Sequence, residues 1–143
     1  MCTSLDVAAY ILTKTGRITT VKLQKLVYYS QAWSLVWDEK PLFKDKIEAW
    51  ASGPVVKRLY LAHRGKYDVR RVPGGNANRL SRNQKETIDA VLVYYGNRSS
   101  QWLVDLTHKE SPWREARKGL SPGERGDRVI THEAMALYYI GLL

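Results

Sequence analysis

The sequence predicts a mainly α-helical protein, with residues 1–143 forming a single compact helical domain around a central buried helix at about residues 20–37. No Gly or Pro interrupts that stretch, and its apolar side chains fall on every side when it is wound as a helix. The length of 143 residues and the hydrophobic content of 44% allow one ordinary core and not two. Because it lacks a wide polar face, the helix at 20–37 is expected inside, wrapped by other helices.

The amino-terminal half carries clear helix-end signals. Residues 3–6, Thr-Ser-Leu-Asp, are typical of a capping box and predict a first helix that ends at Gly16. Thr19 or Thr20 is expected to cap the central helix, and residues 38–41 end it.

The next part of the chain predicts at most a small β-hairpin or short sheet, from residues 42–51 and 67–72. Between these stretches, Pro54 is expected at the first position of a helix over residues 54–63. Residues 73–78, rich in Gly and Asn, are expected to form a loop.

The carboxy-terminal half predicts four helices. Ser81, in a Ser-x-x-Gln capping box, starts one that Gly96 closes, and Ser99 or Ser100 starts the next, from Gln101 to about Lys109. A short helix follows over residues 111–119, then an exposed loop over 120–128 and a last helix over 132–139, capped by Thr131. Helical spacing directs the following side chains into the core: Ile88, Val91, Leu92, Tyr95, Trp102, Leu103, Leu106, Ala134, Met135, Leu137 and Tyr138.

The formal charge of +9 is concentrated in one segment. Residues 57–85 contain nine basic side chains and one acidic side chain, Asp68. Two interpretations stay open at this point: a solvated basic face that aids solubility, or a docking surface for an acidic partner.

Several classes of protein are disfavoured. The longest near-apolar run, residues 134–143, is too short to cross a membrane, and the amino terminus lacks a charged region ahead of an apolar stretch, so we expect a soluble, cytoplasmic protein. Cys2 is alone and the three histidines are scattered, so we expect neither a metal nor another cofactor. Asp105 and His108 could orient a general base, but a histidine bonded to its own helix end is the favoured interpretation. We therefore do not expect an enzyme.

Five tryptophans and nine tyrosines accompany a single phenylalanine. Both rings combine a large contact area with a polar group and are enriched at binding hot spots. Trp33, Trp102 and Trp113 are expected in the core, whereas the exposure of Trp37, Trp50, Tyr28 and Tyr60 stays open. Base stacking on such rings beside a basic groove is an alternative, although no RNA-binding strand motif accompanies them.

Three motifs then occur in order: residues 23–26 (LQKL) followed by Tyr28-Tyr29, residues 47–55 (IEAWASGPV), and residues 106–108 (LTH) followed by Pro112-Trp113. Together they resemble the Panacea domain, the SocA-like antitoxin family that also includes phage-associated GepA-like proteins. The resemblance covers essentially the whole chain, except for the loops at 73–79 and 120–128, where no motif matches.

The resemblance implies a mostly helical antitoxin of a bacterium or prophage. Such an antitoxin neutralises a toxin encoded next to it, generally by direct protein contact. Members of this family are paired with diverse toxins, many of which block translation. The founding member is described as an adaptor that delivers its toxin to a protease. The alternative from the residues themselves is a basic nucleic-acid-binding regulator, for instance of its own operon.

The family motifs also imply roles for individual residues. A structural role is favoured for a buried stripe, a turn and a helix start: Leu23, Leu26, Gly53, Pro54, Thr107, Pro112 and Trp113. Partner contacts are expected among these motif, aromatic and basic residues: Gln24, Lys25, Tyr28, Trp50, Lys57, Arg58, Tyr60, Arg64, Arg70, Arg71 and His108. For the five motif residues of this second set (Gln24, Lys25, Tyr28, Trp50 and His108), a structural role is an equal alternative.

Overall fold

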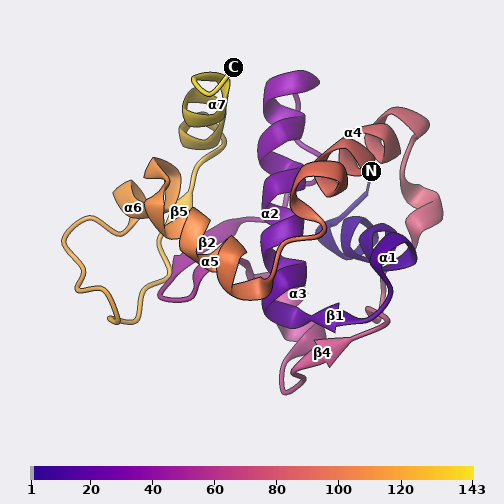
Figure 1. Cartoon of the computed structure of the whole chain (residues 1–143), viewed down its shortest axis with the longest axis horizontal. Coiled ribbons are helices and arrows are strands. Elements are labelled where there is room, and N and C mark those ends of the chain that lie inside the picture. Colours follow the sequence, from indigo (N-terminus) through magenta and orange to yellow (C-terminus); the bar gives the residue numbers. More distant parts are fainter. Residues whose placement is uncertain (1) are drawn as a thin grey trace.

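Helix α2 (Thr20–Trp37) runs through the middle of the computed structural model, which describes residues 2–143, and other helices lie around it (Figure 1). Its bounds are those predicted, and the Thr19 side chain caps it by accepting a hydrogen bond from the Lys22 N–H at 3.1 Å. Every residue from 23 to 34 is buried, whereas Val21 and Trp37 near its two ends are exposed. The prediction of a central buried helix is confirmed for its middle turns.

Helix α1 (Ser4–Thr15) packs against α2 and has the predicted ends. The Thr3 N–H donates to the Asp6 carboxylate at 2.9 Å, as expected of a capping box. Gly16 follows the helix with a φ of 71°, in the left-handed region that favours glycine.

Four helices form the carboxy-terminal half: α4 (Arg82–Tyr95), α5 (Ser100–Lys109), α6 (Ser111–Ala116) and α7 (His132–Ile140). The side chains of Ser81, Ser99 and Thr131 accept backbone hydrogen bonds at the starts of α4, α5 and α7, as predicted. Helix α6 begins at Ser111, as in the predicted range, but it ends at Ala116, before Gly119.

Strand β2 (Ile47–Trp50) is the middle strand of a three-stranded antiparallel sheet, between β3 (Gly53–Val56) and β5 (Val129–Ile130). The predicted helix over 54–63 is wrong in its first three residues, because α3 (Lys57–His63) begins only after β3. Pro54 lies opposite Ala49 on an edge strand, where the missing N–H is tolerated. The β-branched pair of residues 55 and 56 also favours a strand.

The stretch at 67–72 contains a strand, β4 (Asp68–Val69), but its pairing differs from the predicted hairpin. It pairs with β1 (Ile18–Thr19), which joins α1 to α2, and not with residues 42–51. Within 42–51 only β2 is a strand. The predicted loop at 73–78 continues into a 3-10 turn, Ala77–Arg79.

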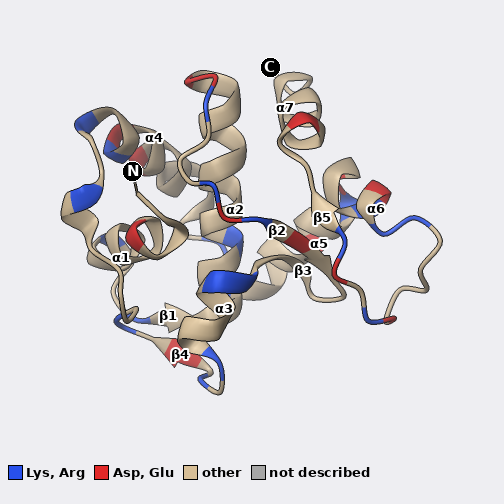
Figure 2. Ribbon diagram, turned by 180° about the vertical axis from the view of Figure 1, so that it is seen from behind, with Lys and Arg blue, Asp and Glu red and all other residues tan. Residues whose placement is uncertain are grey.

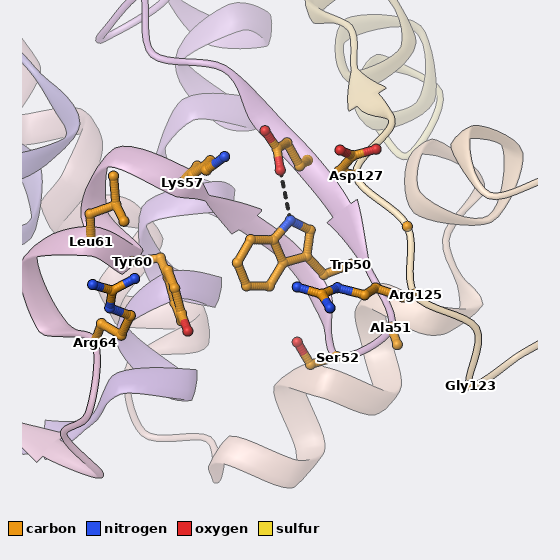
Figure 3. Close-up of a pocket in the computed structure, with 12 residues that line it drawn as sticks. Trp50, Ala51, Ser52, Lys57, Tyr60, Leu61, Arg64, Gly123, Arg125 and Asp127 are labelled. Carbon is orange, nitrogen blue, oxygen red and sulfur yellow. Dashed lines mark hydrogen bonds between the residues drawn. The ribbon is translucent and has the colours of Figure 1, made fainter.

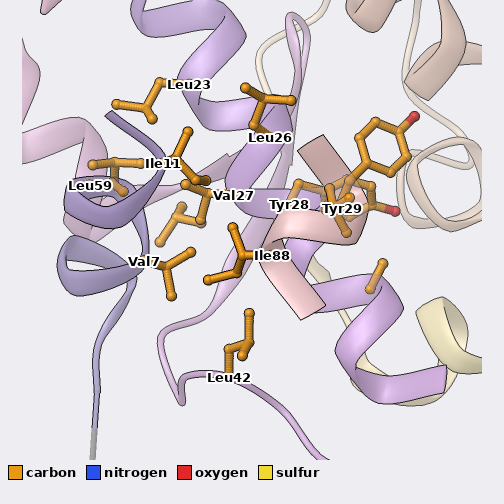
Figure 4. Close-up of a cluster of buried hydrophobic side chains, with 14 of the residues drawn as sticks. Val7, Ile11, Leu23, Leu26, Val27, Tyr28, Tyr29, Leu42, Leu59 and Ile88 are labelled. Atoms are coloured by element: carbon orange, nitrogen blue, oxygen red, sulfur yellow. The ribbon is translucent and has the colours of Figure 1, made fainter. Parts of the chain in front are cut away.

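The core lies where α1, α3 and α4 meet α2 (Figure 4). On the other side of α2, α7 contributes Met135 and Tyr139, which are both fully buried. The prediction that Leu137 points inward is wrong, since 66% of this residue is exposed. Among residues 2–143, no helix has the length and apolar character needed to cross a bilayer.

Polar side chains of α2 are also buried, and they bind the extended segment that follows the helix. The Gln31 amide accepts a hydrogen bond from the Leu42 N–H at 2.7 Å and donates to the Phe43 carbonyl at 2.8 Å. The Ser34 hydroxyl donates to the Lys40 carbonyl at 2.7 Å. These bonds satisfy backbone groups that no β-ladder serves.

A second buried polar cluster joins α2, α6 and α7. The Glu110 carboxylate accepts hydrogen bonds from the hydroxyls of Tyr29, at 2.7 Å, and Tyr139, at 2.6 Å. Burial raises the pKa of Glu110, although these two hydrogen bonds favour the charged form. The Tyr28 and Tyr139 hydroxyls lie 3.0 Å apart, so Tyr28 belongs to this interior network.

Truncation of a buried side chain on α2 tests this placement. Leu26→Ala should lower the free energy of unfolding by about 2–5 kcal/mol, because the fully buried side chain leaves a cavity. Val21→Ala, at an exposed position of the same helix, is the matched control and should change stability little. Urea unfolding of the two variants measures the difference, and equal midpoints would contradict the central position of α2.

Candidate functional site

The first sequence motif binds the backbone of β3 through a buried amide. Gln24 Oε1 accepts from the Val56 N–H at 2.9 Å, and Gln24 Nε2 donates to the Val56 carbonyl at 3.2 Å. The side chain thus supplies the pair of bonds that a neighbouring strand would make. Its Nε2 also lies 3.0 Å from His63 Nε2, and burial lowers the pKa of this histidine. Gln24 therefore fixes both β3 and the end of α3.

Lys25, on α2, supports the turn between β2 and β3 from the protein interior. Its Nζ donates to the Pro54 carbonyl at 3.1 Å, and 1% of the residue is exposed. Gly53 has a φ of 117°, and a Cβ there would lie 2.6 Å from Lys25 Cε. Only glycine fits this approach. Burial lowers the pKa of Lys25 from its ordinary 10.5 to about 7.

The third motif holds the same turn from α5 and α6. The His108 ring stacks on Trp113 with centroids 4.0 Å apart, and Trp113 Nε1 donates to the Trp50 carbonyl at 2.7 Å. Burial, followed by the charge of Lys25, lowers the pKa of His108. The three motifs therefore converge on one turn, residues 50–53.

Arg117 attaches the loop at 118–128 to the sheet. The residue is buried, its guanidinium donates to the Ala49 carbonyl at 3.0 Å, and it also donates to the carbonyls of Ser121 and Glu124. Its Cζ lies 5.3 Å from the Trp113 ring centroid. Together with the hydrogen bond from the Ala49 N–H to the Arg128 carbonyl at 2.7 Å, this side chain holds the loop beside β2.

A groove of about 830 Å³ opens between α3, the β2–β3 turn and this loop (Figure 3). The rings of Trp50 and Tyr60 meet edge to face, with centroids 4.8 Å apart, and both residues are partly exposed. Trp50 Nε1 donates to Glu48 at 2.8 Å, which fixes the indole. The lining consists of Glu48, Trp50, Ala51, Ser52, Lys57, Tyr60, Leu61, Arg64, Gly123, Arg125, Gly126 and Asp127.

Three cations and two carboxylates line the groove. Lys57 and Arg64 stand on the α3 side, and Arg125 reaches toward the indole from the loop (Figure 3). Within residues 2–143, none of the three cations forms a salt bridge. They remain available to carboxylates of a bound molecule, while the rings offer apolar contact area.

Comparison with known proteins identifies the family. Residues 23–114 match the model of the family described as antitoxin SocA-like, Panacea domain. The chain belongs to this family. It is also 34% identical over 109 residues to antitoxin SocA of Caulobacter vibrioides, a match that covers 67% of this chain. The chain spans 58% of the length of that relative. The search of solved structures found no match to this chain.

The structure of this Panacea-domain protein places the expected site residues in three groups. Four expected partner contacts, Trp50, Lys57, Tyr60 and Arg64, come together in the groove. Outside its lining are exposed Arg58, which pairs with Asp45 at 3.4 Å, and exposed Arg70 and Arg71, which follow β4. The third group is the buried motif residues, namely Gln24, Lys25 and Tyr28, together with the half-buried His108.

The burial of Gln24, Lys25 and Tyr28 bears on the two roles left open for these three residues. A partner that docks on this surface meets no side chain of Gln24, Lys25 or Tyr28, because each is at most 3% exposed. Their hydrogen bonds serve β3, the turn and Tyr139. The structure thus supports a structural role for all three. The residues expected to be structural, Leu23, Leu26, Gly53, Pro54, Thr107, Pro112 and Trp113, are all buried.

Sequence reasoning missed the second wall of the groove. Glu48, Arg125 and Asp127 line it, and two of them come from the loop at 120–128, where no motif exists. The only local signal is the abundance of glycine and charge in that loop. The position of the loop depends on Arg117, whose burial no periodicity indicates.

Two candidate sites raised by the sequence, a metal site and an Asp105–His108 pair, can be compared with the structure. Among residues 2–143, no group of three or more His, Cys, Asp or Glu side chains is placed to hold a metal. Asp105 accepts a hydrogen bond from Gln101 at 2.8 Å, while His108 stacks on Trp113. The geometry thus gives no support to a general base built from these two residues.

The pKa of Lys25 predicts a pH dependence of stability. Between its pKa of about 7 in the folded protein and 10.5 in the unfolded chain, the unfolded state binds more protons, so stability rises with pH. From pH 7 to 8.5 the free energy of unfolding should increase by about 1 kcal/mol per pH unit. Raised pKa values of Cys2 and Tyr10 act mainly at higher pH, and lowered values of His63 and His108 act mainly at lower pH. The lowered pKa of Lys22 adds a slope of the same sign as that of Lys25.

Urea unfolding at pH 7.0, 7.75 and 8.5 measures this slope. Lys25→Met removes the titrating group while keeping a long buried side chain, so its slope over this range should be close to flat. An equal slope in the variant and the original protein would show that Lys25 is not the titrating group.

Proposed function

We propose that this protein is an antitoxin that neutralises a toxin encoded next to it by direct protein contact, with the groove as the docking surface. Membership of the SocA-like family supports the antitoxin role. The observation that carries the docking surface is the convergence of the family motifs on residues 50–53, the turn that presents Trp50 to the groove.

The aromatic pair is the proposed anchor. Trp50 and Tyr60 present ring surface that a toxin side chain can cover, and their rigid placement lowers the entropic cost of binding. Large aromatic side chains in a pocket that loses its water contribute most of the binding energy in many interfaces. The anchor therefore determines how slowly the complex dissociates.

The cations of the groove select an acidic toxin surface. Lys57, Arg64 and Arg125 outnumber the two carboxylates, and a complementary acidic patch pairs with them. Figure 2 shows further basic positions on α3 and on the segment after β4, which includes Arg70 and Arg71. Charges of this kind accelerate association without contacting the bound partner.

Masking is sufficient for neutralisation in this arrangement. A toxin whose acidic or substrate-binding surface lies in the groove is sterically blocked, and no chemical step by the antitoxin is needed. A toxin that blocks translation, for example through a surface that engages ribosomes or nucleic acid, fits this mode of inhibition. Delivery of the bound toxin to a protease is compatible with the same docking surface.

The aromatic anchor is tested by dissociation kinetics. Trp50→Ala or Tyr60→Ala should weaken binding of the co-expressed toxin by roughly 2 kcal/mol or more, about 30-fold in Kd, mainly through faster dissociation. Tyr67→Ala is the matched control, since this tyrosine is 80% exposed and lies outside the groove. Surface plasmon resonance and rescue of growth against the toxin give the two readouts. Equal kinetics in all three folded variants would exclude the groove as the docking site.

The basic residues outside the groove should behave differently. Arg70→Glu combined with Arg71→Glu should slow association and reduce its dependence on salt, with little change in dissociation. Arg125→Glu, in the groove, should also speed dissociation because its charge faces the bound toxin. If both changes leave all rates unaltered, the basic segment is only a solvated face.

A DNA-binding measurement with the same purified protein tests the alternative of a nucleic-acid-binding regulator. A regulator should bind operator DNA specifically, with an affinity that falls steeply as salt rises. Nanomolar binding of this kind together with failure to rescue growth against the adjacent gene's product would overturn the antitoxin proposal.

A further inference from the structure

An apolar surface lies at the end of the molecule formed by α7 and the last turn of α2. Leu137, Ile140, Leu142 and Leu143 are each more than half exposed. At the end of α2, Trp37 is 45% exposed and stacks on the core residue Trp33, with centroids 4.9 Å apart. Soluble proteins seldom leave several large apolar side chains uncovered in one part of the molecule.

A hollow of about 370 Å³ connects the two helices. Leu35 and Val36 of α2 line one side, Ala136 and Ile140 of α7 line the other, and Pro41 closes it. Leu137 precedes Ile140 by three residues and so lies on the same face of α7. We define the α7 face as the apolar residues of the hollow and its surroundings. They are Leu35, Val36, Trp37, Pro41, Ala136, Leu137, Ile140, Leu142 and Leu143. Figure 1 shows the end of α2 and α7 next to each other.

The charge of this face differs from that of the rest of the chain. Residues 134–143 contain no charged side chain, although the protein carries a formal +9. In Figure 2, α7 is tan apart from one acidic band near its start. Around the hollow the rim carries Glu39, Lys40 and Glu133, which is one base against two acids.

We propose that the α7 face joins two copies of this chain in a two-fold symmetric dimer. Two-fold symmetry places one patch against the same patch of the other copy, so a charge near the axis meets a like charge. The α7 face limits this repulsion because residues 134–143 carry no charged side chain, whereas the basic segment at 57–85 would repel itself. The rim adds complementary pairs, because Lys40 of one copy can face Glu133 of the other.

An acidic partner does not fit this face, which has a single cation at its rim. The groove and the α7 face also share no residue. A dimer built on α7 therefore leaves both grooves open, and each copy keeps its own docking surface. Its stoichiometry with the toxin is then two to two.

The dimer is tested by sedimentation equilibrium of the purified protein over a wide concentration range. We expect twice the monomer mass for the unmodified chain, and the monomer mass for Leu137→Arg and for Ile140→Glu, because each places two like charges across the axis. Tyr67→Glu is the control: it puts a charge at an exposed aromatic near the α2 amino terminus, about 27 Å from the hollow for an 18-residue helix, and should remain dimeric. Circular dichroism and thermal melting verify that each variant is folded.

Mixing the two charged variants distinguishes self-contact from any other occupant. Leu137→Arg and Ile140→Glu should recover the dimer mass when combined, because opposite charges then meet across the interface. A monomeric unmodified chain at all concentrations would overturn the proposal. So would a dimer that survives both substitutions, or charged variants that stay monomeric when mixed but lose toxin binding, which would assign the face to the toxin.

Discussion

Hydrogen bonds from buried polar side chains of α2 to the backbone of residues 40–56 are the constraint on which the rest of this structure depends. Residues 40–46 cross α2 as irregular chain, and β3 is an edge strand, so backbone groups on both would be buried without partners. Gln24, Lys25, Gln31 and Ser34 supply those partners. A buried group left unpaired costs about 1–3 kcal/mol. The path of the segment therefore depends on the orientation of α2 about its own axis, which decides where these side chains point.

The function proposed for the groove follows from that constraint. Because Lys25 and Gln24 hold the turn and β3, they fix where Trp50 and α3 stand, and Trp113 and Arg117 complete the support from the other side. Gln24 and Lys25 of the first motif lie below the surface, whereas Trp50 of the second motif reaches the groove. The buried motif residues thus position a site whose charged walls include the loop at 120–128.

The helices were predictable from local chemistry, because caps such as Ser81 and Thr131 and the apolar pattern of α2 act within a few residues. Long-range pairing was not: nothing local shows that residues 54–56 bind the Gln24 amide as a strand, or that β5 reaches β2 across the chain. For the same reason, the sequence could not decide whether Gln24 and Lys25 on α2 contact a partner or support the fold. Motif and charge pointed to four of the twelve lining residues, Trp50, Lys57, Tyr60 and Arg64. Arg125 could not be found in this way, because its loop is held by the buried Arg117.

Hydrogen–deuterium exchange of this protein, alone and in complex with the product of the adjacent gene, tests the role of the groove most directly. Slower exchange is expected at residues 48–64 and 121–127 in the complex, because these segments form its walls. Residues 23–31 should exchange slowly in both states, since they are already buried. Protection of residues 68–85 or 134–143 with no change at the groove would contradict the proposed docking surface.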